Sequence, residues 1–130
     1  MAPKTQTCLV HPLKSSIDRL SCDIARSQPI PPLISEHDVL VQVLAVGLNP
    51  HDHKNLTFFP EPGHGFGCDF CGIVVDDNKG AESPQHRRFP PGTRVCGGAS
   101  PHFLGSLLRP GAFAQFVAMD ERLLLRVPDS

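Results

Sequence analysis

The run from Val39 to Leu48 constrains the fold of this chain more than any other segment. It reads VLVQVLAVGL, with four valines, and only Gln42 and Gly47 interrupt its apolar character. An apolar run of this length between turn residues is typical of a strand that is covered on both faces. Asn49-Pro50 ends it, because proline disfavours a helical residue before it and has no N–H for a neighbouring strand. We therefore predict a central strand buried on both faces.

Short apolar runs separated by turn residues occupy much of the remaining chain. A weak strand pair is expected between Ser15 and Ile30, where Ile17, Leu20 and Ile24 are apolar. Further strands are expected at Phe70–Val75, Gly92–Gly97, Gly111–Val117 and Leu123–Val127. Many short strands with turn signals and almost no helix predict a mainly β domain, either a small barrel or a sandwich.

The other segments are expected to be short helical turns, loops or irregular chain. His51–Leu56 is expected to form one helical turn that Asn49 can cap, and Thr57–Gly67 is expected to be loop because of its prolines and glycines. A surface connection is expected over Asp76–Pro91, and a loop with a little helix over Ala99–Pro110. Residues 1–14 are expected to be an irregular N-terminal segment, which leaves residues 15–130 as one domain.

Composition excludes several classes of partner. The formal net charge is −1, so no basic field attracts nucleic acid or an anionic membrane. The longest apolar runs hold about ten residues, whereas about 20 are needed to span a bilayer. The first residues lack the apolar core of a signal peptide. We expect a cytoplasmic protein with no nucleic-acid or membrane partner.

The five cysteines are an odd number spread widely along the chain, which favours free and mostly buried thiols over a disulfide framework. Cys68-x-x-Cys71 has the spacing of half a tetrahedral metal site. A second pair is missing, since Cys96 stands alone in the sequence. On a strand, Cys68 and Cys71 would also point to opposite faces, because side chains alternate with a period of two. No metal site is expected.

One polar segment follows the first long apolar run, and one polar residue precedes the second. His51, Asp52, His53 and Lys54 come directly after the Asn-Pro stop, where the simplest interpretation is a solvated turn. Asp69 lies between two cysteines at the start of a strand and is expected to accept hydrogen bonds from backbone N–H groups.

Four segments in order carry a resemblance to a known family: VLVQVLAVGLNPHDHK, GFGCDFCGIVV, PPGTRVCGG and GAFAQFVAMDERLLLRVPDS. They resemble the N-terminal GroES-like domain of the medium-chain dehydrogenase/reductase superfamily, in its zinc-independent branch. The wording LNPHDHK and GCDFCG is most similar to fungal trans-acting enoyl reductases that serve polyketide synthases. The resemblance implies a GroES-like, partly open β-barrel with short helical turns over residues 15–130.

The same resemblance implies a second, Rossmann domain that holds the nicotinamide cofactor. No G-x-G-x-x-G following a strand occurs in the 130 residues, and the glycines of Gly63–Gly67 have the wrong spacing. These residues therefore lack the cradle for the pyrophosphate. Zinc members of the superfamily place metal ligands at the positions of Asn49–Asp52 and Gly67–Asp69, where this sequence does not match them.

In this family the segment after the first long strand lies at the cleft that faces the nicotinamide. The resemblance therefore implies that His51, Asp52, His53 and Lys54 bind NADP(H). Lys54 is the candidate catalytic residue, since its ammonium group could reach either the cofactor or the carbonyl oxygen of an acyl thioester as negative charge develops there. Either His51 or His53 could donate a proton near neutral pH.

The resemblance implies an oxidoreductase of secondary metabolism. It would be an NADPH-dependent enoyl reductase acting in trans on acyl chains carried by a polyketide synthase or a polyketide synthase–peptide synthetase hybrid. The alternatives are a truncated, inactive remnant of such a reductase and a small β-barrel that binds a protein partner. Whether these residues are active by themselves, the polyketide substrate, the stereochemistry, the proton donor and the oligomeric state all stay open.

Overall fold

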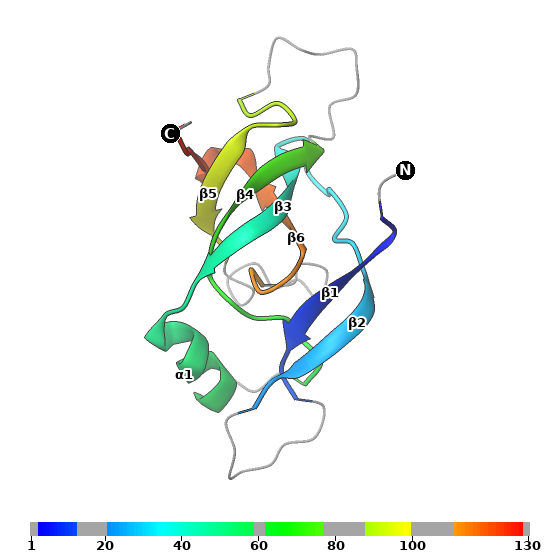
Figure 1. Ribbon diagram of the computed structural model, residues 1–130, viewed down its shortest axis with the longest axis vertical. Coiled ribbons are helices and arrows are strands. Elements are labelled where there is room, and N and C mark those ends of the chain that lie inside the picture. The colour runs from blue at the N-terminus through cyan, green and yellow to red at the C-terminus, as the bar shows by residue number, and fades with distance from the viewer. Residues whose placement is uncertain (1–2, 13–20, 59–61, 77–87, 100–110, 129–130) are drawn as a thin grey trace.

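The computed structural model describes residues 3–12, 21–58, 62–76, 88–99 and 111–128. They form two antiparallel sheets, a short helix and a single 3₁₀ turn (Figure 1). The smaller sheet pairs β1 (Thr5–Val10) with β2 (Asp23–Pro29). The larger sheet has the order β6-β3-β4-β5-β7, with strands Phe116–Asp120, Asp38–Gly47, Asp69–Asp76, Arg94–Gly98 and Leu125–Arg126. The mainly β prediction is confirmed, as two open sheets rather than a closed barrel.

The central strand β3 is where the core forms. It pairs with β4 along one edge and with β6 along the other, so its first half lies inside the larger sheet. Val39 and Val41 are fully buried, and the core around them includes Leu124, which precedes β7, and residues of the other strands: Phe70, Val74, Val95, Val117 and Met119. Each fully buried apolar side chain of this size contributes about 1.5–3 kcal/mol. The strands predicted at β4 and β5 are confirmed within two residues of their ends.

The second half of β3 corrects the prediction of burial on both faces. Pairing with β6 ends at Gln42. Val43 still packs against the core, but the apolar side chains that follow it are exposed. Leu44 is 56% exposed, Val46 42% and Leu48 84%. The apolar run therefore predicted the strand correctly but predicted the burial of its second half wrongly. In the described part of the chain, no element packs over these three side chains.

The N-terminal strand β1 was not expected, since residues 1–14 read as irregular. The polar residue Gln6 occupies a buried position of β1 and so obscures the apolar alternation of this strand. It is only 2% exposed, and its Oε1 accepts a hydrogen bond of 2.8 Å from the Phe116 N–H. Cys8 and Val10 follow on the same buried face. Its partner β2 falls within the predicted Ser15–Ile30 region, although Ile17 and Leu20 lie outside the described residues.

Several other boundaries differ from the prediction. Helix α1 spans Pro50–Phe58, so Thr57 and its neighbour are helical rather than loop. Residues 111–115 are not strand, because β6 begins only at Phe116. The strand expected at Leu123–Val127 is reduced to β7, after the 3₁₀ turn Glu121–Leu123. The segment 100–110 and most of the Asp76–Pro91 connection lie outside the described residues.

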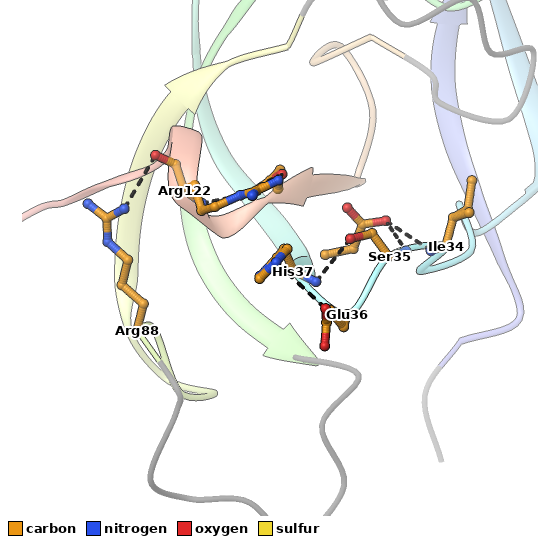
Figure 2. Close-up of polar contacts among 8 residues, drawn as sticks. Ile34, Ser35, Glu36, His37, Arg88 and Arg122 are labelled. Carbon is orange, nitrogen blue, oxygen red and sulfur yellow. Dashed lines mark hydrogen bonds and ion pairs between the residues drawn. The ribbon is translucent and has the colours of Figure 1, made fainter.

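Polar contacts fix the start of β3 and the end of β6 (Figure 2). The buried Asp38 accepts the N–H groups of Ile34 and Ser35, at 2.9 and 3.0 Å from its Oδ2. Asp120 caps the 3₁₀ turn by accepting the Arg122 backbone N–H at 2.9 Å. The guanidinium of Arg122 also binds the Asp120 carboxylate, with Nη2 2.6 Å from Oδ2.

The Asp120–Arg122 contact predicts a pH dependence of stability. Hydrogen bonding from the Arg122 side chain, followed by its backbone N–H and positive charge, lowers the pKa of Asp120 to about 2. Because the folded pKa lies below the unfolded value of about 3.9, the stabilisation is complete above that value and is lost as the pH falls from about 4 to 2. We expect Asp120→Asn to lower the Tm at pH 7 and to make no difference near pH 2.

Thermal unfolding followed between pH 2 and pH 7 measures this effect. Asp23→Asn is the matched control, because Asp23 is an exposed aspartate on β2, far along the chain from Arg122. A Tm difference for Asp120→Asn that stays constant across this pH range would contradict the assignment.

Candidate functional site

The end of β3, the start of β4 and the first turn of α1 meet at one end of the larger sheet (Figure 1). Gly47 pairs with Asp69, so the two strand ends lie side by side. A Cβ at position 47 would lie 3.2 Å from the Asp69 Cβ, which shows how closely the strands approach. We refer to the residues Gly47–Lys54 and Cys68–Asp69 as the β3–α1 corner.

Hydrogen bonds between side chains and backbone hold the β3–α1 corner together. The Asp52 Oδ2 accepts the Asn49 N–H at 2.8 Å, while the Asp52 N–H donates to the Asn49 carbonyl at 3.0 Å. This is the carboxylate half of a capping box, and Pro50 occupies the first helical position, where its missing N–H costs nothing. The Asn49 Nδ2 donates to the Asp69 Oδ2 at 3.2 Å and so connects the helix to β4.

Two of the sequence expectations change in detail here. Asn49 does stand at the helix N-terminus as predicted, but the Asp52 carboxylate accepts the hydrogen bond that caps it. Asp69 is the first residue of β4, where it accepts a side-chain N–H from Asn49. The contact between Asn49 and Asp69 joins residues 20 positions apart, so the local sequence does not reveal it.

Cys68 completes the inner side of the corner. Burial raises the pKa of its thiol to about 11, together with the charge of Asp52, a hydrogen bond to the Asp52 side chain and the charge of Asp69. At neutral pH the thiol therefore keeps its proton. Since the thiolate is the reactive form of cysteine, Cys68 is a poor nucleophile at this pH.

This arrangement predicts how Cys68 reacts with an alkylating reagent. Its alkylation rate in the folded protein should continue to rise with pH up to about 11, since only the thiolate reacts. Asp52→Asn keeps an oxygen that can accept the Asn49 N–H but removes the charge, so the midpoint of this pH profile should move down. Iodoacetamide labelling followed by mass spectrometry of the Cys68 peptide measures both profiles. An unchanged midpoint in Asp52→Asn would contradict the pairing.

The four residues predicted to bind the cofactor separate into two groups. Asp52 is 5% exposed and is turned into the corner, whereas His51, His53 and Lys54 are exposed on the opposite side of α1. The helix backbone therefore presents two imidazoles and one ammonium group to solvent, next to the end of the larger sheet. The structure brings all four together on one helical turn, and their roles stay predictions.

An apolar groove lies beside the β3–α1 corner and was missed by sequence reasoning. It has a volume of about 390 Å³, and its lining combines β1 with the exposed end of β3 and the chain before β6: Thr7, Cys8, Leu9, Val46, Leu48, Phe113, Ala114 and Gln115. Leu48 belongs to both the groove and the β3–α1 corner, so the two adjoin. No local signal could reveal the groove, because it depends on a strand in the first ten residues that the sequence does not announce.

The pairing of β4 with β5 determines where three of the cysteines lie relative to one another. Cys71 lies on β4, whereas Cys68 directly precedes this strand, and its carbonyl accepts the Ala99 N–H at 2.7 Å. Cys96, isolated in the sequence, lies opposite Cys71 on the neighbouring strand. Over the described ranges, no three His, Cys, Asp or Glu side chains are placed to hold a metal ion together.

The described helices include none with the length and apolar character needed to cross a membrane.

Comparison with known proteins places this fold in a family. The family model described as the alcohol dehydrogenase GroES-like domain matches residues 35–129. The chain belongs to this family. The resemblance inferred from the four sequence segments is thereby confirmed.

Two curated relatives of this chain are named trans-enoyl reductases. The trans-enoyl reductase calK of Penicillium decumbens is 47% identical over 135 residues, a match that covers 100% of this chain and 36% of the relative. The trans-enoyl reductase sthE of Phaeosphaeria nodorum is 40% identical over 129 residues, covering 99% of this chain and 34% of the relative. The chain therefore spans about a third of the length of the curated relatives that it matches.

Solved structures agree with the GroES-like fold. An alcohol dehydrogenase superfamily protein from Novosphingobium aromaticivorans superposes with a TM-score of 0.63 at 30% identity, over 95% of this chain and 34% of that one. The quinone oxidoreductase from Coxiella burnetii superposes with a TM-score of 0.68 at 21% identity, over 97% of this chain and 38% of that one. The second match supports the fold alone.

Proposed function

We propose that this chain is the catalytic-domain portion of a zinc-independent, NADPH-dependent enoyl reductase. It acts in trans on acyl chains carried by a polyketide synthase or a polyketide synthase–peptide synthetase hybrid. The observation that carries the proposal is the 47% identity to a trans-enoyl reductase across the whole chain. The reaction adds a hydride to the β-carbon and a proton to the α-carbon of an unsaturated acyl thioester.

The exposed side of α1 fits a nicotinamide dinucleotide. His51, His53 and Lys54 can contact ribose hydroxyls or phosphate oxygens, since all three side chains are exposed and Lys54 carries a positive charge. When bound, the cofactor supplies the hydride. No G-x-G-x-x-G segment occurs within residues 1–130, so the pyrophosphate would be held by residues outside them.

Within this domain, Lys54 stabilises the charge that develops on the thioester oxygen as the enolate forms. A fixed positive group near that oxygen lowers the energy of the transition state more than that of the bound substrate. His51 or His53 delivers the proton. The capping contact of Asp52 with Asn49, at 2.8 Å, and the contact of Asn49 with Asp69, at 3.2 Å, tie the start of the helix that carries these groups to the end of β4.

The apolar groove supports an acyl substrate. Its lining is mostly hydrophobic, and its volume of about 390 Å³ lies in the range of small-molecule sites. Because Leu48 lines the groove and lies two residues before the start of α1, an alkyl chain in the groove would bring its thioester end toward α1. All five cysteines are free, which fits a reaction in the cytoplasm, where thiols stay reduced.

A chimera tests the function directly. Residues 1–130 replace the matched part of the calK reductase, which is 47% identical, so that the chain is joined to a natural remainder. We expect the purified chimera to oxidise NADPH only when an α,β-unsaturated acyl-pantetheine thioester is present. Residues 1–130 without the remainder are the matched control and should bind NADPH no better than about millimolar, since they hold no pyrophosphate cradle.

A folded chimera that binds NADPH but leaves the thioester unchanged would contradict the reductase proposal. One observation then favours a second candidate, a module that binds a protein partner. The exposed Leu44, Val46 and Leu48 form a contiguous apolar edge on β3, of the kind that marks interaction surfaces. Capture of a polyketide synthase by the chain, lost in Leu48→Lys, would support that candidate.

A further inference from the structure

Two cysteines that lie far apart in the sequence face each other across the larger sheet. Cys71 on β4 is the direct register partner of Cys96 on β5. The register runs without a bulge from Asp69–Gly98 to Ile73–Arg94, so the pairing is fixed on both sides. Both residues are free thiols and partly exposed.

The hydrogen bonds on either side show which kind of ladder position the pair occupies. The Ala99 N–H donates to the Cys68 carbonyl at 2.7 Å, and the Val74 N–H donates to the Thr93 carbonyl at 2.9 Å. Each of these hydrogen-bonded pairs lies three register steps from the Cys71–Cys96 pair. Hydrogen-bonded and non-hydrogen-bonded pairs alternate along an antiparallel ladder, so the two cysteines occupy a non-hydrogen-bonded position.

This position brings the two side chains as close as a sheet allows. In a non-hydrogen-bonded pair the Cα atoms are about 4.5 Å apart and the side chains lie on the same face. Disulfides span Cα distances of about 4.4–6.8 Å, so this pair falls within their range. Their other sheet neighbours leave room: Ala45 pairs with Cys71 and is small, and Leu125 pairs with Cys96 and is 66% exposed.

We propose that Cys71 and Cys96 form a reversible disulfide when the protein meets a disulfide oxidant such as oxidised glutathione. One cysteine thiolate attacks the glutathione disulfide, whose S–S bond breaks and releases one glutathione thiolate. The second cysteine thiolate attacks the resulting mixed disulfide and releases the other glutathione. The two protein thiols lose two electrons and two protons, and the oxidant becomes two molecules of reduced glutathione.

The link would join β4 to β5 at the middle of their pairing and close the chain between residues 71 and 96. Closing a loop of this length restricts the unfolded chain and should raise the Tm by about 5 °C or more. Reduced glutathione or dithiothreitol would restore the dithiol. Cys68 takes no part, because it precedes β4 and its carbonyl accepts the N–H of Ala99, three residues beyond Cys96.

Incubation of the folded chain in glutathione buffers of increasing oxidised fraction tests the proposal. After acid quenching and alkylation of the remaining thiols, we expect an intact mass that shows three alkylated cysteines and the loss of two hydrogens. Peptide mapping should find Cys71 linked to Cys96. Cys71→Ser and Cys96→Ser should each abolish the link and the gain in Tm, and Cys22→Ser should leave both, since Cys22 is exposed and belongs to no such pair.

Three outcomes would overturn the proposal: no oxidation of the folded chain, stable glutathione adducts at Cys71 or Cys96 without a link, or a link between other cysteines. The mapping of the unsubstituted protein decides the matter even if a serine variant fails to fold. The experiment uses no enzymatic activity, so its result is independent of the proposed reductase function.

Discussion

Replacing Lys54 by alanine in the calK chimera is expected to lower kcat/KM for an unsaturated acyl-pantetheine about 100-fold or more. Loss of one group that stabilises a developing oxyanion typically has an effect of this size. The side chain is exposed on α1 and is not part of the core, so its removal should leave the fold intact. Steady-state oxidation of NADPH at varied thioester concentration measures the change. Lys54→Arg should recover part of the activity, because it keeps the positive charge.

Lys4→Ala is the matched control, since it removes the same ammonium group from an exposed position in the N-terminal segment. It should leave kcat/KM unchanged. If Lys54→Ala instead raised only the KM for NADPH and left kcat as it was, Lys54 would bind the cofactor and would not act on the substrate oxygen. Unaltered kinetics in both substrates would remove Lys54 from the site altogether.

The second large effect concerns stability and follows from the contact between β3 and β4. A Cβ at Gly72 would lie 2.2 Å from the Gln42 carbonyl oxygen and 2.6 Å from the Val41 Cγ1. The carbonyl belongs to the backbone, so the clash is relieved only if the two central strands separate. We expect Gly72→Ala to lower the free energy of unfolding by about 3 kcal/mol or more, a large part of the 5–15 kcal/mol typical of a domain. Guanidinium unfolding followed by circular dichroism measures it.

Gly98→Ala provides the matched control on the neighbouring strand. A Cβ at Gly98 would meet only the Asp69 Oδ1, at an ordinary distance of 3.7 Å. Its unfolding midpoint should stay close to that of the unsubstituted protein. Similar midpoints for the two glycine variants would mean that β3 and β4 tolerate a wider separation than the structure shows.

The strands in which apolar residues dominate were predicted well from the sequence. β3 and β4 carry such runs, whereas β5 (RVCGG) was indicated by the Pro-Gly turn before it. β1 was not predicted, because the residues that bury it are distant in the sequence. The Gln6 side chain accepts a hydrogen bond from the Phe116 N–H, 110 positions away. A polar residue that is buried by a contact at this separation leaves no local trace in the sequence.

The same reasoning explains what could be predicted of the site. The polar residues after the Asn-Pro stop could be named, because a stop followed by titratable groups is visible locally. The direction in which each of these side chains faces could not be predicted, since it depends on how the start of α1 is tied to the ends of β3 and β4. Asp52 became an internal hydrogen-bond acceptor, while Lys54 remained exposed. The Cys71–Cys96 pair was invisible for a related reason: it depends on the register in which β4 pairs with β5, which the spacing of the cysteines in the sequence does not reveal.

The bare outer half of β3 also determines how this domain behaves at high concentration. A net charge of −1 provides almost no electrostatic repulsion between copies. Leu44, Val46 and Leu48 then offer an apolar surface for contact between copies, at the end of a strand whose pairing with β6 has already ended at Gln42. A charge introduced at this surface, as in Leu44→Lys, should therefore reduce the self-association of the isolated domain.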